Sequence, residues 1–132
     1  MTTRKKIVQL PRRLLSDSRG WFVKIVDGTE EGNPFPCEVY ITSARPGERR
    51  GGHYHRLANE WFTLLSGEAV LSLRDAVTGE ESEVRLDASN PVTIHVPPGM
   101  AHSFLNSGNA DFILAAFTDR TYDPGDTVPE TF

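Results

Sequence analysis

Three histidines and one glutamate stand at spacings that suit a shared metal ion. His53 and His55 are two residues apart, so their side chains leave the same face of an extended strand. Glu60 follows a short turn and would return on the next antiparallel strand at the same level, and His102 comes much later, after a Pro-Pro-Gly turn. Imidazole and carboxylate groups are suitable donors for divalent transition metals. We therefore predict one divalent metal ion (Zn, Fe, Mn or Ni) held by His53, His55, Glu60 and His102.

Only a closed or folded-over sheet could bring His102 to the other three residues, and the sequence has the pattern of an all-β protein. Short apolar segments alternate with clusters of Gly, Pro, Asn and Asp, and no segment has a convincing helical period. Strands at this spacing favour a sandwich or barrel. The predicted strands are 5–10, 20–26, 37–44, 51–56, 60–67, 69–76, 81–87, 92–97, 102–108 and 111–118. Residues 33–36 are predicted to form a loop, Thr78-Gly79 a hairpin turn, and 121–132 an irregular tail across a barrel mouth or a neighbour.

The chain is expected to form one domain over residues 1–132, with 38% hydrophobic residues to build a single core. In the strand 60–67, Phe62 and Leu64 share the phase of Glu60 and would line the barrel below the metal. Trp61 and Leu65 alternate with them and would face a second layer or a partner subunit.

At these residues the sequence resembles the cupin superfamily, small β-barrels in which two motifs supply a three-His, one-Glu metal site. The first motif reads G-x5-H-x-H-x4-E-x6-G from Gly47 to Gly67, and the second reads P-x-G-x2-H-x3-N from Pro97 to Asn106. One position departs, since Pro91 stands where the second motif usually opens with Gly, and no ligand is lost. The resemblance implies an all-β, single-cupin fold, a jelly-roll barrel also called a double-stranded β-helix.

Two further segments resemble cupins that act on nucleotide sugars. Residues 17–22 (DSRGWF) are similar to the D-x-R-G-x-F segment of dTDP-4-keto-6-deoxyhexose 3,5-epimerases and 3,4-ketoisomerases. Residues 39–55, 96–108 and 121–127 resemble the C-terminal cupin of bifunctional epimerase/reductases of capsular polysaccharide synthesis. The resemblance implies a metal-dependent epimerase or isomerase for a nucleotide-linked 4-keto-6-deoxy sugar. The chain has no Gly-rich dinucleotide fingerprint, so any reduction would happen elsewhere.

The chemistry implied by this resemblance needs a base that is not a metal ligand. The ketone of a 4-keto sugar acidifies the C3 and C5 protons, and a ligated imidazole has its ring nitrogen committed to the metal. Tyr40 and Tyr122 are the candidates, with His95 as an outsider. The ketoisomerases also place a Tyr near the position of Tyr40, although a hydrogen-bonded core residue is the alternative there. His95 and Tyr54 alternate away from the predicted interior, which favours a surface position for His95 and a structural role for Tyr54.

Arginine side chains are the candidates for binding the diphosphate of a nucleotide sugar. A guanidinium fork matches phosphate oxygens, and Arg19, Arg49 and Arg50 lie in or before the motifs. Arg50 stands three residues before His53, as the corresponding Arg does in the ketoisomerases. A solvated loop charge is the alternative for Arg49.

Bulk properties restrict the partners. A formal net charge of −4 argues against nucleic-acid and membrane-surface binding, which usually need a basic face. There is no apolar stretch of membrane-spanning length, the N-terminus lacks a signal-peptide core, and Cys37 is the single cysteine, predicted to be a buried small hydrophobe. We expect a cytoplasmic homodimer. The same donor set also suits an iron or manganese oxygenase, and a non-catalytic, metal-stabilised sugar-binding module is a third possibility.

Overall fold

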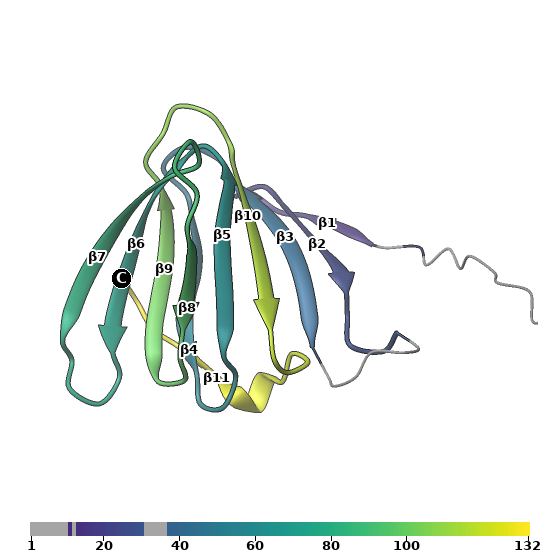
Figure 1. The fold of residues 1–132 in the computed structure, drawn as a ribbon, viewed down its shortest axis with the longest axis vertical. Coiled ribbons are helices and arrows are strands. Elements are labelled where there is room, and N and C mark those ends of the chain that lie inside the picture. The colour runs from purple at the N-terminus through teal and green to yellow at the C-terminus, as the bar shows by residue number, and fades with distance from the viewer. Residues whose placement is uncertain (1–10, 12, 31–36) are drawn as a thin grey trace, which may run out of the picture.

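Two antiparallel β-sheets face each other in the computed structural model, which describes residue 11, residues 13–30 and residues 37–132 (Figure 1). The first sheet has six strands, in the order β1 (Leu14–Ser16), β2 (Trp21–Val26), β3 (Glu38–Ala44), β10 (Phe112–Thr118), β5 (Glu60–Ser66) and β8 (Thr93–Val96). The second has five, in the order β11 (Thr127–Pro129), β4 (Arg49–His55), β9 (Met100–Asn106), β6 (Glu68–Asp75) and β7 (Glu81–Asp87). A short 3-10 turn, η1 (Pro124–Asp126), precedes β11. The chain crosses repeatedly between the two sheets, which confirms the predicted all-β jelly-roll.

Strands β2 to β10 correspond to the predicted strands from 20–26 to 111–118. The Thr78-Gly79 turn lies between β6 and β7, as expected. The predicted strand 5–10 and the predicted loop 33–36 lie outside the described residues. No helix in the described ranges has the length and apolar character needed to cross a membrane.

The expectation of an irregular tail was wrong in part. Residues Thr127–Pro129 form β11, which pairs antiparallel with β4 so that Thr127 lies opposite His55 and Pro129 opposite His53. The formation of β11 does not follow from its own sequence, because three residues are too few to show an alternating pattern. β4 would otherwise leave a row of backbone donors and acceptors unpaired at the edge of its sheet.

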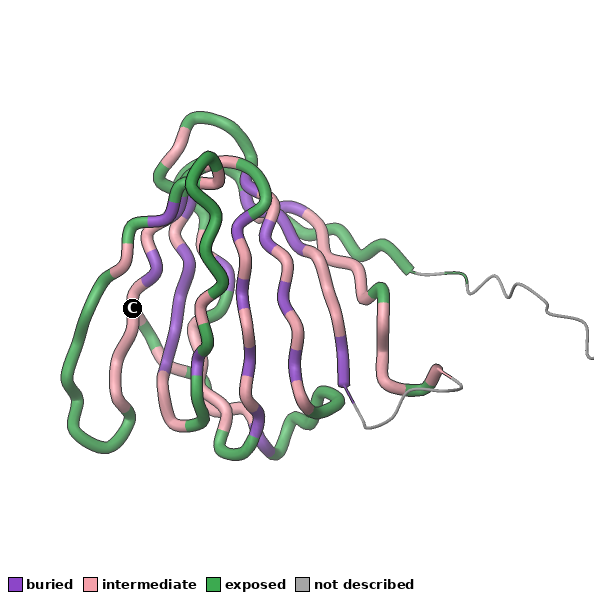
Figure 2. Tube along the Cα trace, viewed as in Figure 1, coloured by how far each residue is buried: buried purple, intermediate pink, exposed green. Residues whose placement is uncertain are grey.

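The core lies between the sheets and takes buried apolar side chains from β3 and from β5 to β10. Figure 2 shows buried positions recurring along these strands. Phe62 and Leu64 point inward as predicted, whereas Leu65 is exposed. The rings of Phe62 and Phe104 lie 4.8 Å apart between their centroids. Burying each such side chain stabilises the fold by roughly 1.5–3 kcal/mol. Phe62 also lies 5.3 Å from the ring of His102, so the apolar core continues directly to the predicted ligands.

A bulge in β4 decides which of its side chains face the core. The register against β9 shifts between Gly51 and His53, and Gly51 and Gly52 both have positive φ, +95° and +83°. Arg50 therefore lies opposite Phe104, and His53 lies opposite His102. Arg50 and His53 face the same side although they are three residues apart.

Candidate metal centre

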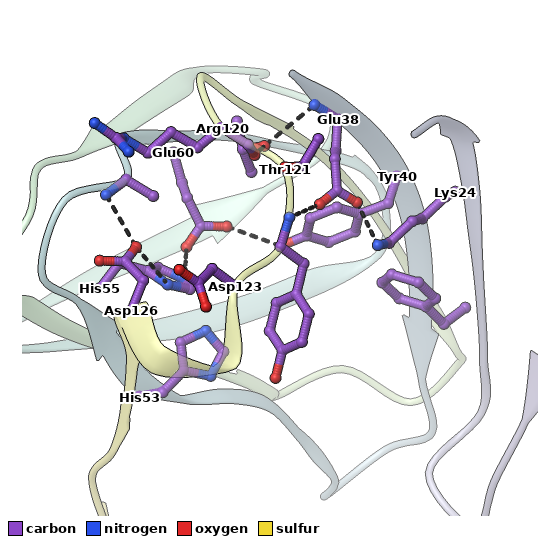
Figure 3. A pocket seen from close by; sticks show the side chains of 14 residues that line it. Lys24, Glu38, Tyr40, His53, His55, Glu60, Arg120, Thr121, Asp123 and Asp126 are labelled. Carbon is purple, nitrogen blue, oxygen red and sulfur yellow. Dashed lines mark hydrogen bonds and ion pairs between the residues drawn. The ribbon is translucent and has the colours of Figure 1, made fainter. Parts of the chain in front are cut away.

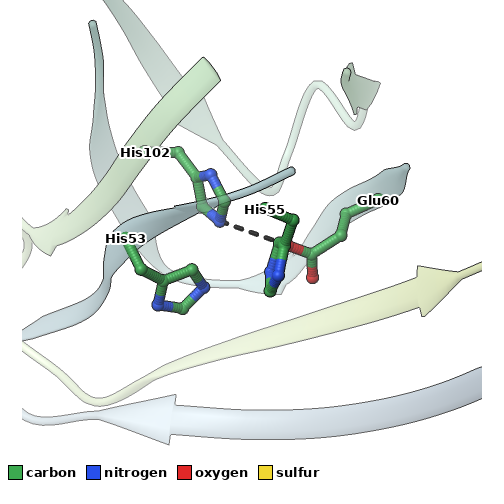
Figure 4. A group of neighbouring side chains, drawn as sticks. All are labelled: His53, His55, Glu60 and His102. Atoms are coloured by element: carbon green, nitrogen blue, oxygen red, sulfur yellow. Dashed lines mark ion pairs between the residues drawn. The ribbon is translucent and has the colours of Figure 1, made fainter. Parts of the chain in front are cut away.

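The four predicted ligands come together at one end of the barrel (Figure 4). His53 and His55 extend from β4, Glu60 opens β5, and His102 comes from β9. One nitrogen of each ring and one carboxylate oxygen lie within 4.8 Å of one another. The four side chains meet as the sequence predicted, and both sheets contribute to the cluster. Their role as metal ligands stays a prediction.

The donor atoms are arranged as if for a shared cation. Glu60 Oε1 lies 2.6 Å from His55 Nε2 and 3.4 Å from His102 Nε2. Among the described residues, Glu60 Oε1 and His102 Nε2 are nevertheless buried without a hydrogen-bond partner. A buried, unsatisfied polar group costs on the order of 1–3 kcal/mol. A divalent ion would compensate this cost, so the residues present fit the predicted metal.

Three neighbouring groups hold the ligands in orientation. His102 Nδ1 lies 3.1 Å from the carbonyl oxygen of Met100, and His55 Nδ1 lies 3.2 Å from Thr127 Oγ1. The hydroxyl of Tyr40 donates to Glu60 Oε2 at 3.0 Å. Partners of this kind fix ring and carboxylate orientation in metal sites.

The protein environment favours the metal-binding protonation states of His53 and Glu60. Burial, together with the nearby His102 and His55, lowers the pKa of His53 to about 4, so its ring is neutral at pH 7. Although burial opposes ionisation of Glu60, contacts with His102 and His55 hold the pKa of its carboxyl well below the ordinary value. For His55, burial opposes protonation, but contact with Glu60 and the nearby Asp126 raise the pKa of its ring. Burial, reinforced by Glu60, raises the pKa of Tyr40, so its hydroxyl remains a donor. A neutral imidazole beside an ionised carboxylate is the form required for metal binding.

A cavity of about 310 Å³ opens beside the ligands (Figure 3). Three of the four ligands lie in its wall, and the other lining residues are Phe22, Lys24, Glu38, Tyr40, Ala58, Thr118, Arg120, Thr121, Tyr122, Asp123 and Asp126. A second hollow of about 290 Å³ lies against His53 and His102 and is lined also by Arg19 and Arg50. Tyr40 and His53 border both spaces, so the donor cluster is accessible from two directions.

Both tyrosines predicted as candidate bases line the first cavity. Tyr40 is hydrogen-bonded to Glu60, which agrees with the alternative of a structural hydrogen bond. Tyr122 is 61% exposed, and the ammonium of Lys24 lies 5.7 Å from its ring centroid. His95 is exposed and stacks on Trp61 at a centroid distance of 5.0 Å, away from the ligands, as the sequence predicted.

The three predicted substrate arginines have different surroundings. Arg19 pairs with Asp17 at 2.8 Å and lines the second hollow. Arg50 is buried and donates to the carbonyl oxygens of Ser43 at 2.7 Å and Trp21 at 3.2 Å, so its guanidinium joins the two sheets. Diphosphate binding by Arg19 and Arg50 stays a prediction.

Diphosphate binding by Arg49 also stays a prediction. Its side chain leaves β4 on the face opposite to Arg50 and, because of the bulge, opposite to His53, and it donates to Ser103 Oγ at 3.3 Å. It borders an outer hollow together with Arg74 and Phe132.

Three residues of the cavity wall, Lys24, Glu38 and Asp126, and the neighbouring Thr127 were not anticipated from the sequence. Lys24 contacts the buried carboxylate of Glu38, and the backbone N–H of Tyr122 donates to the same carboxylate. Asp126 and Thr127 approach His55 from the tail. A glutamate at the start of a largely apolar strand was the available signal for Glu38, whereas the place of Thr127 depends on the pairing of β11.

Two facing antiparallel sheets around a three-His, one-Glu cluster define a cupin. Residues 15–132 match the family described as the polysaccharide biosynthesis C-terminal domain. The chain belongs to this family. Separately, Cys37 is buried, as the sequence predicted for a small hydrophobic residue.

Similar proteins have roles in polysaccharide and sugar metabolism. The chain is 29% identical over 108 residues to a UDP-2-acetamido-2,6-beta-L-arabino-hexul-4-ose reductase of Pseudomonas aeruginosa, covering 82% of this chain and 28% of the reductase. It is 25% identical over 114 residues to the spore coat polysaccharide biosynthesis protein SpsL of Bacillus subtilis, covering 83% and 76% of the two chains.

A solved structure shows the same fold. The capsular polysaccharide assembling protein CapF of Staphylococcus aureus superimposes with a TM-score of 0.83 and 25% identity, covering 94% of this chain and 33% of CapF. The chain therefore spans about a third or less of the reductase and of CapF. Oxalate decarboxylase of Bacillus subtilis, at 18% identity and a TM-score of 0.73, shares the fold.

Proposed function

We propose that this protein is a metal-dependent cupin epimerase or isomerase that acts on a nucleotide-linked 4-keto-6-deoxy sugar in polysaccharide or deoxysugar biosynthesis. The observation that carries the proposal is the donor cluster of His53, His55, Glu60 and His102, three of whose members lie in the wall of a cavity large enough for a sugar ring. Membership of the polysaccharide biosynthesis family supports the pathway class.

The name of the reductase supports the substrate class. A hexul-4-ose is a sugar with a ketone at C4, and the reductase named above acts on one that is linked to UDP. The ketone makes the hydrogens on C3 and C5 acidic. Removal of one of these protons and the return of a proton to the opposite face give an epimer. Removal of the C3 proton, protonation at C4 and loss of the C3 hydroxyl proton give the isomerised 3-keto sugar.

Different residues of this chain would have different roles in that reaction. A divalent ion held by the four ligands would supply Lewis acidity toward the sugar oxygen that gathers negative charge. Tyr40 orients Glu60 by its hydrogen bond. Tyr122, in the cavity wall, is the candidate for proton transfer, because a ring nitrogen of each ligand imidazole would be bound to the metal. Arg19 and Arg50, at the second hollow, are the candidates for the diphosphate.

The direct test is exchange of solvent deuterium into the substrate. The metal-loaded protein is incubated in D2O with a UDP-linked 4-keto-6-deoxy-N-acetylhexosamine and, separately, with dTDP-4-keto-6-deoxyglucose, and mass spectrometry follows the sugar. We expect a mass increase of one deuterium per exchanged position, and none with the Glu60→Gln variant. Absence of exchange with both sugars in a metal-loaded protein would contradict the proposal.

The same samples distinguish the two alternatives. Oxygen consumption without exchange would favour the mononuclear iron or manganese oxygenase, because the donor set also suits oxygen chemistry. Sugar-nucleotide binding without exchange or oxygen consumption would favour the sugar-binding module. A homodimer, a cytoplasmic location, and the lack of nucleic-acid and membrane partners remain predictions, and light scattering tests the first.

A further inference from the structure

The C-terminal residues 123–132, here called the C-terminal strap, run along one side of the metal centre. The strap begins with η1 beside the loop between β4 and β5 and continues as β11 along β4 (Figure 1). Its register places Thr127 opposite His55 and Pro129 opposite His53. Two ligands therefore lie next to strap backbone.

Asp126 holds the loop that separates two ligands. Its Oδ1 accepts from the N–H of Leu57 at 2.7 Å, and its Oδ2 accepts from the N–H of Ala58 at 3.2 Å. Both N–H groups belong to the four-residue loop between His55 and Glu60. The carboxylate is also in the cavity wall and only 8% exposed, so water competes little for these hydrogen bonds (Figure 3). Asp126 thus sets the path of the chain from one ligand to the next.

The strap also orients the ring of His55. Thr127 Oγ1 lies 3.2 Å from Nδ1 of His55, and Asp126 Oδ2 lies 3.8 Å from the same nitrogen. The other nitrogen, Nε2, faces Glu60 at 2.6 Å. A partner on one ring nitrogen fixes which nitrogen faces the metal.

Contacts beyond β11 keep the strap in place. The N–H of Glu130 donates to the carbonyl oxygen of Gly52 at 2.9 Å. The guanidinium of Arg74 donates to Glu130 Oε1 at 2.9 Å and to the carbonyl oxygen of Thr131 at 3.0 Å, and it lies 4.7 Å from the ring centroid of Phe132. The strap is therefore fixed at both ends, with the contacts to His55 between them.

We propose that Asp126 and Thr127 are positioning residues of the metal centre, through which the C-terminal strap sets the affinity of the site for a divalent ion. The proposal rests on the metal centre of the proposed function and is independent of the sugar substrate. Asp126 acts on the spacing of His55 and Glu60, and Thr127 acts on the ring of His55.

The test is metal titration of the whole chain carrying Asp126→Asn or Thr127→Val. Zn²⁺ affinity is measured by competition with a chromophoric chelator, and the visible absorption of the Co²⁺ form reports ligand geometry. We expect roughly tenfold to hundredfold weaker Zn²⁺ binding and an altered Co²⁺ spectrum for both variants. Thr127→Val is nearly isosteric and suits a strand, so its metal-free melting temperature should stay close to that of the wild type.

Two controls separate positioning from general stability. Asp119→Asn changes another carboxylate that accepts hydrogen bonds from the same loop, in this case from Asn59. Among the described residues, Asp119 has no hydrogen bond or ion pair with a ligand. Thr93→Val removes a hydroxyl contact with Thr63, and both residues lie on the six-stranded sheet, away from the strap. Both controls should keep wild-type affinity and spectrum.

Affinities of Asp126→Asn and Thr127→Val within about twofold of the wild type would overturn the proposal, as would equal losses in the two controls. A wild type that binds no Zn²⁺ would overturn it together with the metal centre. A wild type that binds Zn²⁺ but exchanges no deuterium would overturn only the proposed function.

Discussion

The carboxylate of Glu60 contacts two other ligands and Tyr40. One carboxylate oxygen lies near His55 and His102, and the other accepts the hydrogen bond of Tyr40. The residue is 2% exposed, so these neighbours, rather than water, compensate its negative charge. An ionised carboxylate in this setting favours a cation strongly, because few water molecules are available to screen it.

Replacing Glu60 by Gln tests this role with almost no change in volume. We expect Glu60→Gln to lower the bound metal well below one equivalent per chain, and His55→Ala to do the same, since each removes one donor. Elemental analysis of protein purified without chelator or affinity tag measures the loss. Glu83→Gln, on the exposed strand β7, is the matched control. Full occupancy in the Glu60→Gln protein would show that the carboxylate is not a ligand.

At the scale of elements, Arg50 links the two sheets close to the ligands. It extends from β4 and donates to the carbonyl oxygens of Ser43 on β3 and Trp21 on β2. Asp17, in the loop between β1 and β2, lies 3.4 Å from the same guanidinium and also pairs with Arg19. The DSRG segment that resembles nucleotide-sugar cupins therefore has a structural role in this chain.

We expect Arg50→Ala to destabilise the protein by about 2–3 kcal/mol, because it leaves buried carbonyl oxygens without their charged donor. Urea unfolding of the metal-free protein measures the change. Arg19→Ala should cost much less, since its ion pair with Asp17 is exposed to solvent. Equal stability of the Arg50→Ala and wild-type proteins would assign Arg50 to substrate binding alone, which UDP and dTDP titration then tests.

The bulge in β4 is the second element on which the site depends. A Cβ atom at position 51 would lie 2.7 Å from the carbonyl oxygen of His102, and the backbone of Gly51 has φ +95°. Gly47 has a comparable φ of +82° but open space around its Cα. The two glycines therefore separate backbone strain from close packing.

We expect Gly51→Ala to lower the free energy of unfolding by more than Gly47→Ala, whose cost of about 1 kcal/mol comes from backbone strain alone. We also expect only Gly51→Ala to weaken Zn²⁺ binding, because it disturbs the register of His53 against His102. Urea unfolding and metal titration of the two variants measure these effects. Similar results for both variants would mean that the close approach at Gly51 is relaxed without consequence.

For the molecule as a whole, the metal centre joins β4 and β9 of one sheet to β5 of the other. A ligand that binds only the folded state stabilises it, by about 2.7 kcal/mol at a concentration one hundred times its dissociation constant. A metal ion at this position would therefore restrain the separation of the two sheets.

We expect removal of the metal with a chelator to lower the melting temperature by several degrees, and added Zn²⁺ to restore it. Thermal unfolding followed by circular dichroism measures both steps. The Glu60→Gln variant should melt at the same temperature with and without chelator. A wild-type protein that responds as weakly as this variant would show that the site contributes little to stability.

The strands and the grouping of His53, His55 and Glu60 could be predicted from the sequence because both depend on local order along the chain, whereas His102 was assigned to the set through the resemblance of its motif to cupins. Alternation of apolar and polar residues determines which side chains share a face. The H-x-H and H-x4-E spacings are short, so these three residues lie near one another whichever way the sheets are arranged. The separation of Phe62 and Leu64 from Leu65 follows in the same way.

Only the tertiary structure decided which arginine faces the ligands and what the tail does. Simple alternation would place Arg49, Gly51 and His53 on one face of β4, but the extra residue of the bulge turns Arg50 inward instead. The pairing of Thr127 with His55 arises because β4 has an open edge that the tail can reach. Both outcomes depend on backbone hydrogen bonds between segments far apart in the sequence, and the pattern of side chains along one segment does not record them.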